Sequence, residues 1–234
     1  MTELLAVFAR APELGRVKTR LSPPLTAEQA LALHRALVED TLDHLDRVQR
    51  PGLERLLLLS QPLQNSDELN VPGTWTQGVQ ANGELGERLA SLFYTAFRRG
   101  VTRLVVLGSD SPTVPPEVIH EAFDDLENRK VVIGPAEDGG YYLLGCSQWI
   151  PELFQNIEWG TPSVREQTLQ IAKDRNLAVS TLIPWYDIDR GEDLDKLRQE
   201  IAYLKRSAPE LVPMRVAAAL PDFDDSEYTL DSDF

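Results

Sequence analysis

Strand-sized apolar runs alternate with helix-length amphipathic segments through most of this 234-residue chain. Residues 3–9 are almost continuously apolar, and in residues 26–48 apolar side chains recur every three or four positions. Continuous apolar runs are typical of strands buried on both faces, and helices that connect successive strands require mostly parallel pairing. We therefore predict an α/β fold with a mostly parallel central sheet and helices on both faces.

The same alternation predicts the remaining elements. Strands are expected at residues 3–9, 56–59, 104–107, 131–133, 141–144 and 177–183, and helices at residues 26–48, 84–99, 116–127, 161–175 and 191–204. Residues 61–82 are expected to be a polar connection. Because no repeat or low-complexity linker divides the chain, residues 1–206 are predicted to form a single domain. Residues 207–220 are apolar enough to dock on that domain as a short helix.

The charge of the chain is strongly acidic, with one local exception. There are 37 Asp and Glu residues against 23 Lys and Arg, a net charge of -14, so we expect no binding to nucleic acid or anionic membranes. Residues 221–234 contain six acids and no Lys or Arg, and are expected to form a disordered, solvated tail. Residues 1–24 carry four basic side chains against two acidic ones. This segment predicts either a bound anion or pairing with nearby carboxylates.

The expected cellular location of the protein depends on membrane spans, signal peptides and cysteines. No apolar run approaches the roughly 18 residues of a membrane span, and no basic segment precedes the first apolar run, so we expect neither a span nor a signal peptide. The single cysteine, Cys146, excludes an intramolecular disulfide and a cysteine-cluster zinc site. We expect Cys146 to be a buried structural thiol and the protein to be cytoplasmic.

Four clusters of Gly and charged residues lie at the ends of predicted strands, where open α/β sheets bind their ligands. The first cluster runs from Arg10 to Arg20. Its Gly15 allows the backbone to approach a ligand closely, and Lys18 and Arg20 carry groups that bind phosphate. The spacing of Gly15 and Lys18 fits neither a P-loop nor a dinucleotide-binding glycine motif, so a nucleotide site here is of another design.

The second cluster, Gly108 to Pro112, follows the predicted strand at residues 104–107. A carboxylate at the end of a central strand is well placed to hold Mg²⁺ or Mn²⁺, both of which prefer oxygen ligands. Asp110 is therefore predicted to be a metal ligand. The alternative, which we weigh equally at this point, is that Asp110 or Ser111 caps the next helix.

The third and fourth clusters also contain acids. Asp138 precedes Gly139 and Gly140, a pattern that most often forms a turn but that, facing Asp110, would complete a metal site or activate a hydroxyl. The fourth cluster, Tyr186 to Asp189, places Asp187 and Asp189 on one face if the segment is extended. Its alternative role is to begin the next helix.

Some conspicuous side chains receive a structural interpretation. The segment Trp159 to Pro162 predicts a lid or a wall of the acceptor site, or equally a buried tryptophan. The three histidines, His34, His44 and His120, all lie inside predicted helices and lack a catalytic or metal-binding partner at a suitable spacing. We expect none of them to be catalytic.

Taken in order, these motifs resemble a bacterial glycosyltransferase-like family of unknown function in the GT-A nucleotide-diphospho-sugar transferase superfamily. Some members are labelled arsenosugar-biosynthesis glycosyltransferases. The resemblance covers approximately residues 3–200. It rests on Phe8 to Pro12, Gly15 to Leu21, Gln77-Gly78, Leu85 to Arg88, Gly108 to Pro112, Gly134 to Leu144, Trp159 to Pro162 and Tyr186 to Asp189.

A second group of proteins is similar over shorter stretches. Phospholactate guanylyltransferases, and more distantly molybdenum-cofactor nucleotidyltransferases, have a stretch like Lys18 to Leu21 and an acidic strand end. The segment around Asp110 departs from the Asp-x-Asp of many GT-A enzymes, because it has only one acid. A second metal ligand would then come from Asp138 or Asp189.

The resemblance implies a Rossmann-like GT-A fold and a glycosyltransferase that moves a sugar from a nucleotide-diphospho-sugar to a small-molecule acceptor. Mg²⁺ or Mn²⁺ would be held by Asp110 with Asp138 and Asp189, and the general base would be Asp138 first and Asp189 second. Lys18 would also take part in catalysis. The implied substrate-binding residues are Arg10, Gly15, Lys18, Arg20, Glu87, Arg88, Gly139, Gly140 and Trp159.

Two other functions remain open at the level of sequence. A nucleotidyltransferase would use the first cluster, the basic loop from Arg10 to Arg20, at the α-phosphorus of a nucleoside triphosphate. Pyrophosphate would be released. A phosphorylated acceptor would need a further basic cluster, for which the candidates Arg98, Arg99 and Arg103 flank a helix end away from the strand tips. The third alternative is a nucleotide-binding regulatory protein without turnover.

Overall fold

A central sheet of seven strands organises the computed structural model, which describes residues 2–65 and 68–221. The strands are β1 (Thr2–Ala9), β2 (Leu53–Leu59), β3 (Thr76–Val79), β4 (Val101–Gly108), β5 (Val131–Pro135), β6 (Tyr141–Cys146) and β7 (Val179–Thr181). Their order is β3-β2-β1-β4-β6-β5-β7. Only β6 is antiparallel to its neighbours in this sheet, so the predicted mostly parallel α/β fold is confirmed.

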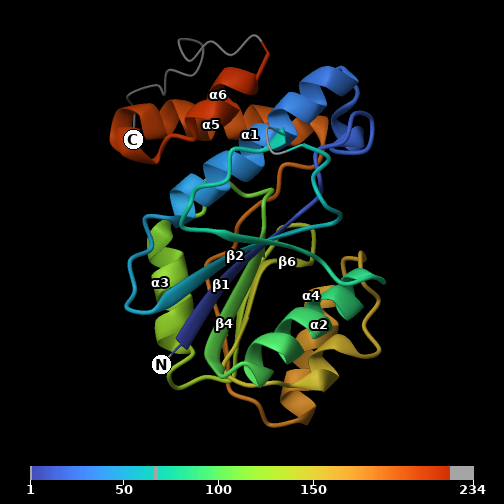
Figure 1. Cartoon of the computed structure of the whole chain (residues 1–234), viewed down its shortest axis with the longest axis vertical. Coiled ribbons are helices and arrows are strands. Elements are labelled where there is room, and N and C mark those ends of the chain that lie inside the picture. The colour runs from blue at the N-terminus through green and yellow to red at the C-terminus, as the bar shows by residue number, and fades with distance from the viewer. Residues whose placement is uncertain (1, 66–67, 222–234) are drawn as a thin grey trace, which may run out of the picture.

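Helices cover both faces of the sheet, as predicted. The α-helices are α1 (Ala27–Leu45), α2 (Leu85–Arg98), α3 (Pro116–Asp125), α4 (Val164–Asp174), α5 (Gly191–Ser207) and α6 (Met214–Ala219), and the short 3-10 helices are η1 (Thr19–Leu21), η3 (Pro151–Phe154) and η4 (Pro209–Leu211). Helix α3 flanks one face, and α2 and α4 flank the other (Figure 1). Helices α1, α5 and α6 gather at the upper end of the view, beyond the carboxyl end of β1.

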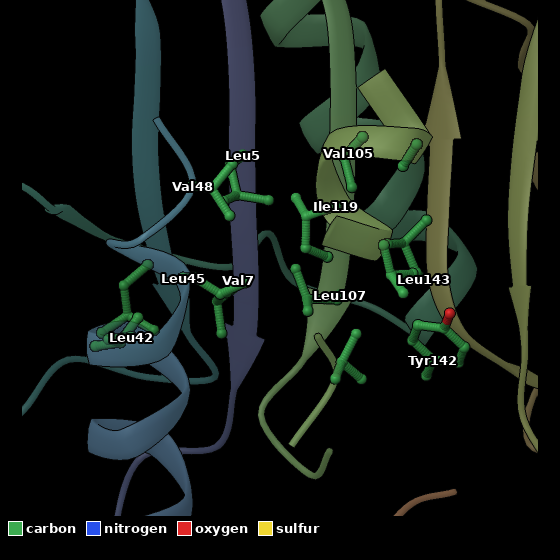
Figure 2. Close-up of a cluster of buried hydrophobic side chains, with 14 of the residues drawn as sticks. Leu5, Val7, Leu42, Leu45, Val48, Val105, Leu107, Ile119, Tyr142 and Leu143 are labelled. Atoms are coloured by element: carbon green, nitrogen blue, oxygen red, sulfur yellow. The ribbon is translucent and has the colours of Figure 1, made fainter. Parts of the chain in front are cut away.

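The core on the α3 face is aliphatic. Figure 2 shows Leu5 and Val7 of β1, Leu107 of β4, Leu42 of α1 and Ile119 of α3 in one cluster, and all five side chains are buried. Burying each such side chain stabilises the fold by about 1.5–3 kcal/mol. The carboxyl-terminal half of α1 thereby fixes this helix against the sheet.

Another apolar cluster joins α1 to the end of the chain. Leu33 and Leu37, from the amino-terminal half of α1, pack with Leu197 and Ile201 of α5 and with Val216 of α6. Residues 207–220, which we expected to dock on the domain, contain the short helix α6, and Val216 and Leu220 of this segment belong to the cluster. Helix α1 is shared between the sheet and this upper layer.

Three predicted boundaries are wrong. The stretch 61–82 is not entirely a connection, because β3 pairs with β2 through its backbone while leaving most of its side chains exposed. The helix expected from Thr161 begins at Val164, since the Thr161 hydroxyl donates to Glu158 O at 2.7 Å and extends the turn. The strand expected at 177–183 is limited to the residues of β7 that pair with β5.

Three further expectations concern the acidic tail, membrane-spanning helices and the single cysteine. The predicted tail, 221–234, lies outside the described residues except for Pro221. Across residues 2–65 and 68–221, no helix has both the length and the apolar character needed to cross a membrane. Cys146 is fully buried as expected, and burial raises the pKa of its thiol.

The docking of α6 predicts a difference between two substitutions on that helix. Val216→Ala should lower the free energy of unfolding by about 2 kcal/mol, because it leaves a cavity against α1. Met214→Ala should change the free energy of unfolding by less than about 0.5 kcal/mol, since Met214 is 65% exposed. Urea denaturation of both variants measures the difference, and equal effects would contradict the docked arrangement.

Candidate active site

A cleft of about 850 Å³ opens beyond the carboxyl ends of the first four strands. Phe8 and Ala9 of β1, Ser60 after β2, Gln80 after β3 and Ser109 after β4 all line it. Strand β1 has β2 on one side and β4 on the other, so the chain crosses the sheet in opposite directions at this point. Such a switch in strand order is where open α/β sheets bind ligands, and the volume suits a small molecule.

The ammonium group of Lys18 is the centre of one wall of the cleft. Its Nζ lies 2.7 Å from Asp110 Oδ1 and 3.1 Å from Asp189 Oδ1, and it donates a hydrogen bond to Ile188 O at 2.6 Å. The Lys18 side chain is 5% exposed, whereas those of Asp110 and Asp189 are 37% and 48% exposed. The structure thus brings together three of the predicted site residues from three separate segments.

Local backbone structure explains why these segments meet. Lys18 has a left-handed conformation, with φ 49°, at the residue that precedes η1. For a residue with a side chain this conformation costs about 1–2 kcal/mol, so its occurrence here indicates a position fixed by its surroundings. On the opposite side, Ile188 N donates to Asp110 O at 2.9 Å, which ties the segment before α5 to the end of β4.

The ion pairs set the charge states of this wall. Burial acts to lower the pKa of Lys18, but the charges of Asp110 and Asp189 raise it above its usual value. Burial acts to raise the pKa of Asp110, but Lys18, with His34 and Arg10, brings it below its usual value. The Lys18 ammonium and the Asp110 carboxylate therefore stay charged through the neutral range.

Asp187 is a neighbour of this wall that the predicted site residues did not include. Its Oδ1 accepts a hydrogen bond from Ser111 Oγ at 2.6 Å. Burial, together with the charges of Asp110, Asp138 and Asp189, raises the pKa of Asp187 to about 6. The sequence already indicated this residue, because it shares its motif with Asp189.

The predicted general base, Asp138, is exposed in the turn between β5 and β6. Its Oδ1 accepts a hydrogen bond from Gly140 N at 2.8 Å. Asp138 influences Asp187 electrostatically, so it belongs to the same acidic group, but it does not line the cleft. Its catalytic role stays a prediction.

Two glycines show how the other motifs pack on one another. A Cβ on Gly139, which has φ +94°, would lie 2.3 Å from Pro162 O. A Cβ on Gly86 would lie 2.1 Å from Trp159 Nε1. Trp159 also meets Tyr141 edge-on, with ring centroids 6.3 Å apart. The motif at Trp159 to Pro162 is therefore wedged between the start of α2 and the β5–β6 turn.

Arginines supply the positive charge of the cleft. Arg10, Arg16, Arg20 and Arg88 all line it, as the sequence predicted for three of them. Arg88 is fixed by donating to Gly83 O at 2.7 Å and to Gln80 Oε1 at 3.1 Å, and Arg16 lies 3.4 Å from Glu13. Arg10 and Arg20 are exposed and form no ion pair within the described part of the chain.

The remaining predicted substrate-binding residues do not line the cleft. Glu87 caps its own helix, since its Oε2 accepts from Glu84 N at 2.8 Å. Gly15 has φ +72° and turns the basic loop. For these two, and for Gly139, Gly140 and Trp159, contact with a substrate stays a prediction.

His34, which we expected to be a simple helix residue, lines the cleft and is 2% exposed. Burial lowers its pKa, so the neutral ring donates through Nε2 to Arg10 O at 3.0 Å. Its Nδ1 is buried without a hydrogen-bond partner among the described residues. His34 thereby holds the start of the basic loop. A polar residue on the apolar stripe of the predicted helix was the only sequence signal for this role.

The carboxylates of the cleft wall are the candidate ligands for a metal ion. Within residues 2–65 and 68–221, no group of three or more His, Cys, Asp or Glu side chains is arranged to hold a metal ion. Asp110 and Asp189 nevertheless direct one oxygen each at a common point. Mg²⁺ is often held by one or two carboxylates plus substrate phosphates, so this pair fits a metal that a bound nucleotide also ligates.

Comparisons with known proteins agree with this architecture. A sequence model of the family described as "Uncharacterized protein conserved in bacteria (DUF2064)" matches residues 41–161. A crystal structure from Desulfovibrio desulfuricans G20, provisionally named a nucleotide-diphospho-sugar transferase, is 29% identical, with a TM-score of 0.80 over 99% of this chain and 100% of that one. Its fold is the same Rossmann-like α/β fold.

Two further proteins extend the comparison to nucleotidyl transfer. The 2-phospho-L-lactate guanylyltransferase of Methanothermobacter thermautotrophicus is 27% identical over 187 residues, which is 77% of this chain and 78% of the relative. The 4-diphosphocytidyl-2C-methyl-D-erythritol synthase of Anaerococcus prevotii is 14% identical and has a TM-score of 0.54 over 88% of this chain and 97% of that one. The second likeness concerns the fold alone.

The contact between His34 and Arg10 O predicts a local effect on the basic loop. His34→Leu should accelerate amide hydrogen exchange in residues 11–18, because the Arg10 carbonyl loses its donor, and should cost about 1–3 kcal/mol. His34→Gln should restore slow exchange, since its amide nitrogen replaces Nε2.

His44 provides the matched control for this experiment. It lies on the same helix, is also buried, and its Nε2 is 2.8 Å from Val114 O. His44→Leu should lower stability without changing exchange in residues 11–18. If both leucine variants loosen the loop equally, His34 has no specific effect on it.

Proposed function

The chain belongs to the family of uncharacterized bacterial proteins DUF2064, and from the geometry of its cleft we propose that it is a glycosyltransferase. It transfers a sugar from a nucleotide-diphospho-sugar to a small-molecule acceptor, with the help of Mg²⁺ or Mn²⁺. One observation carries the proposal. Exposed arginines and a convergent carboxylate pair face the same cleft, at the switch point between β1 and β4.

The arginines bind the diphosphate. Arg10 and Arg20 are exposed guanidinium groups in a chain of net charge -14, and each can grip phosphate oxygens with two hydrogen bonds. Arg88, held by Gln80 and Gly83, presents its charge at a fixed place on the wall. These groups stabilise the negative charge that grows on the leaving nucleoside diphosphate.

Asp110 and Asp189 would hold the divalent cation together with the phosphates of the substrate. When bound, the cation supplies Lewis-acid stabilisation of the leaving diphosphate. Asp138 is proposed as the third acid of this region and as the general base. Its exposed carboxylate accepts the proton of the acceptor hydroxyl while the acceptor oxygen bonds to the anomeric carbon of the sugar. The bond between that carbon and the phosphate oxygen breaks, and the nucleoside diphosphate leaves.

The relatives support a transferase at a coarser level. The Desulfovibrio structure matches the chain almost from end to end, and its provisional name is that of a nucleotide-diphospho-sugar transferase. We propose the same class of donor for this protein, small molecules rather than nucleic acid as its partners, and the cytoplasm as its location.

A nucleotidyltransferase is the second candidate, and two observations favour it. The guanylyltransferase relative covers 77% of the chain, and Arg16 and Arg88 add cationic groups to the cleft. In that reaction an acceptor phosphate attacks the α-phosphorus and pyrophosphate leaves. The predicted acceptor cluster does not contribute, because Arg99 pairs with Glu54 and Arg103 pairs with Glu3, away from the cleft.

A ligand screen separates the two candidates. In the presence of Mg²⁺ or Mn²⁺, nucleotide-diphospho-sugars should raise the melting temperature of the protein, because a ligand that binds only the folded state stabilises it. Release of a nucleoside diphosphate would then identify the reaction. Stabilisation by triphosphates alone, with release of pyrophosphate, would support the second candidate instead. Absence of any shift at millimolar ligand would contradict both.

The role of Asp110 predicts a specific loss. Asp110→Asn should abolish the metal-dependent part of the thermal shift, since it removes the charge of one of the two convergent carboxylates. Asp195→Asn, at an exposed acid that pairs with Arg198 one turn further along α5, should leave that part unchanged. An undiminished metal-dependent shift in Asp110→Asn would assign Asp110 a purely structural role.

A further inference from the structure

The Lys18 ammonium occupies the point that a cation shared by Asp110 and Asp189 would occupy. Its three partners are two carboxylate oxygens and one carbonyl oxygen, all within 3.1 Å of Nζ. These are hard oxygen donors, which are also the ligands that Mg²⁺ and Mn²⁺ take in proteins. In the structure, the protein's own cation satisfies the donors that the proposed metal would need.

Two cations cannot share this pair at low cost. Lys18 is almost completely buried, so solvent screens its charge poorly, and a divalent ion a few ångströms away would be strongly repelled. The partly exposed carboxylates leave an approach from the cleft, but only toward donors that Lys18 already neutralises. Metal binding therefore requires the ammonium to move.

The surroundings allow the side chain to move without the loop. Val17 and Leu21, on either side of Lys18, are both buried and anchor the backbone. The lysine side chain itself is a flexible chain of four carbons that ends in a compact charge. Arg10 and Arg20 line the same cleft, so a phosphate bound there offers the ammonium an alternative anionic partner.

We propose that Lys18 and a divalent cation bind the Asp110–Asp189 pair in alternation, so that Lys18 blocks the metal until a phosphate draws it away. The proposal rests on the proposed function for the identity of that phosphate, as part of a nucleotide. It implies that the free protein binds metal weakly and that nucleotide and metal bind cooperatively. By thermodynamic linkage, each must raise the affinity for the other by the same factor.

The decisive measurement is a titration of the full chain with Mn²⁺ in the absence of nucleotide. Electron paramagnetic resonance of the free ion monitors the binding. Lys18→Met should bind Mn²⁺ at least about tenfold more tightly than the wild-type protein, because the two carboxylates lose their internal partner. Lys196→Met is the matched control. Lys196 also pairs with a carboxylate, Glu137 at 2.6 Å, so its loss should leave the Mn²⁺ affinity unchanged.

A measurement on the wild-type protein avoids dependence on the folding of a variant. Acetylation of Lys18 by an amine-reactive ester, followed by mass spectrometry, should be slow in the free protein because the side chain is buried. Saturating Mn²⁺ should accelerate it severalfold. Equal Mn²⁺ affinity in wild type and Lys18→Met, or Lys18 acetylation that Mn²⁺ leaves unchanged, would overturn the proposal.

Nucleotide probes separate this proposal from the proposed function. GDP and GTP should raise the Mn²⁺ affinity of the wild-type protein, and should raise that of Lys18→Met by a smaller factor. If neither these nor nucleotide-diphospho-sugars bind, the proposed function fails. The gain of Mn²⁺ affinity in Lys18→Met and the acetylation result would still support the alternation of the two cations.

Discussion

The buried ion pairs of Lys18 are the interaction on which the site depends. Removing an ammonium from water is costly, and only well-placed carboxylates and a carbonyl acceptor compensate for it. Asp110 comes from the end of β4, Asp189 from the segment before α5, and Lys18 from the loop after β1. One charged group therefore fixes three segments that are distant in sequence, and it gives the cleft a wall whose charges are already paired before any ligand binds.

Helix α1 supports this arrangement from behind. Its carboxyl-terminal half packs on the sheet through Leu42, and its amino-terminal half packs on α5 and α6 through Leu33. Between these contacts, His34 donates a hydrogen bond to the carbonyl of Arg10, where the basic loop begins. The helix thus connects the sheet, which sets the positions of the strand ends, to the layer that carries Asp189. Because the cleft lies between two layers, such a shared helix fixes the positions of its walls relative to each other.

The sequence predicted those parts of the molecule that follow from regular patterns. Apolar runs located most strands, and the rule that parallel strands end at one edge predicted that Lys18 and Asp110 lie at the same edge of the sheet. Strand β3 was missed because its side chains are mostly exposed and only backbone pairing defines it. The ion pairs of Lys18 were also missed, since a lysine in a basic loop suggests a bound phosphate. Only the fold shows that Lys18 pairs with two carboxylates of the protein itself. Likewise, a contact such as that between His34 and Arg10 depends on tertiary distance, which no local pattern encodes.

The acids near the cleft are the reason why we propose sugar transfer rather than nucleotidyl transfer. Both proposed reactions need a pyrophosphoryl group to be neutralised, so Lys18, the arginines and a metal would serve either one equally well. They differ in the acceptor, because a hydroxyl needs a base whereas a phosphate needs cations. The turn between β5 and β6 presents Glu137 and Asp138. Glu137 pairs with Lys196, and Asp138 accepts a hydrogen bond from the backbone of its own turn. Burial, and then the charges of the neighbouring carboxylates, raise the pKa of the nearby Asp187, and this group of acids would repel an approaching phosphate. A hydroxyl would meet no such barrier and would find a carboxylate able to take its proton.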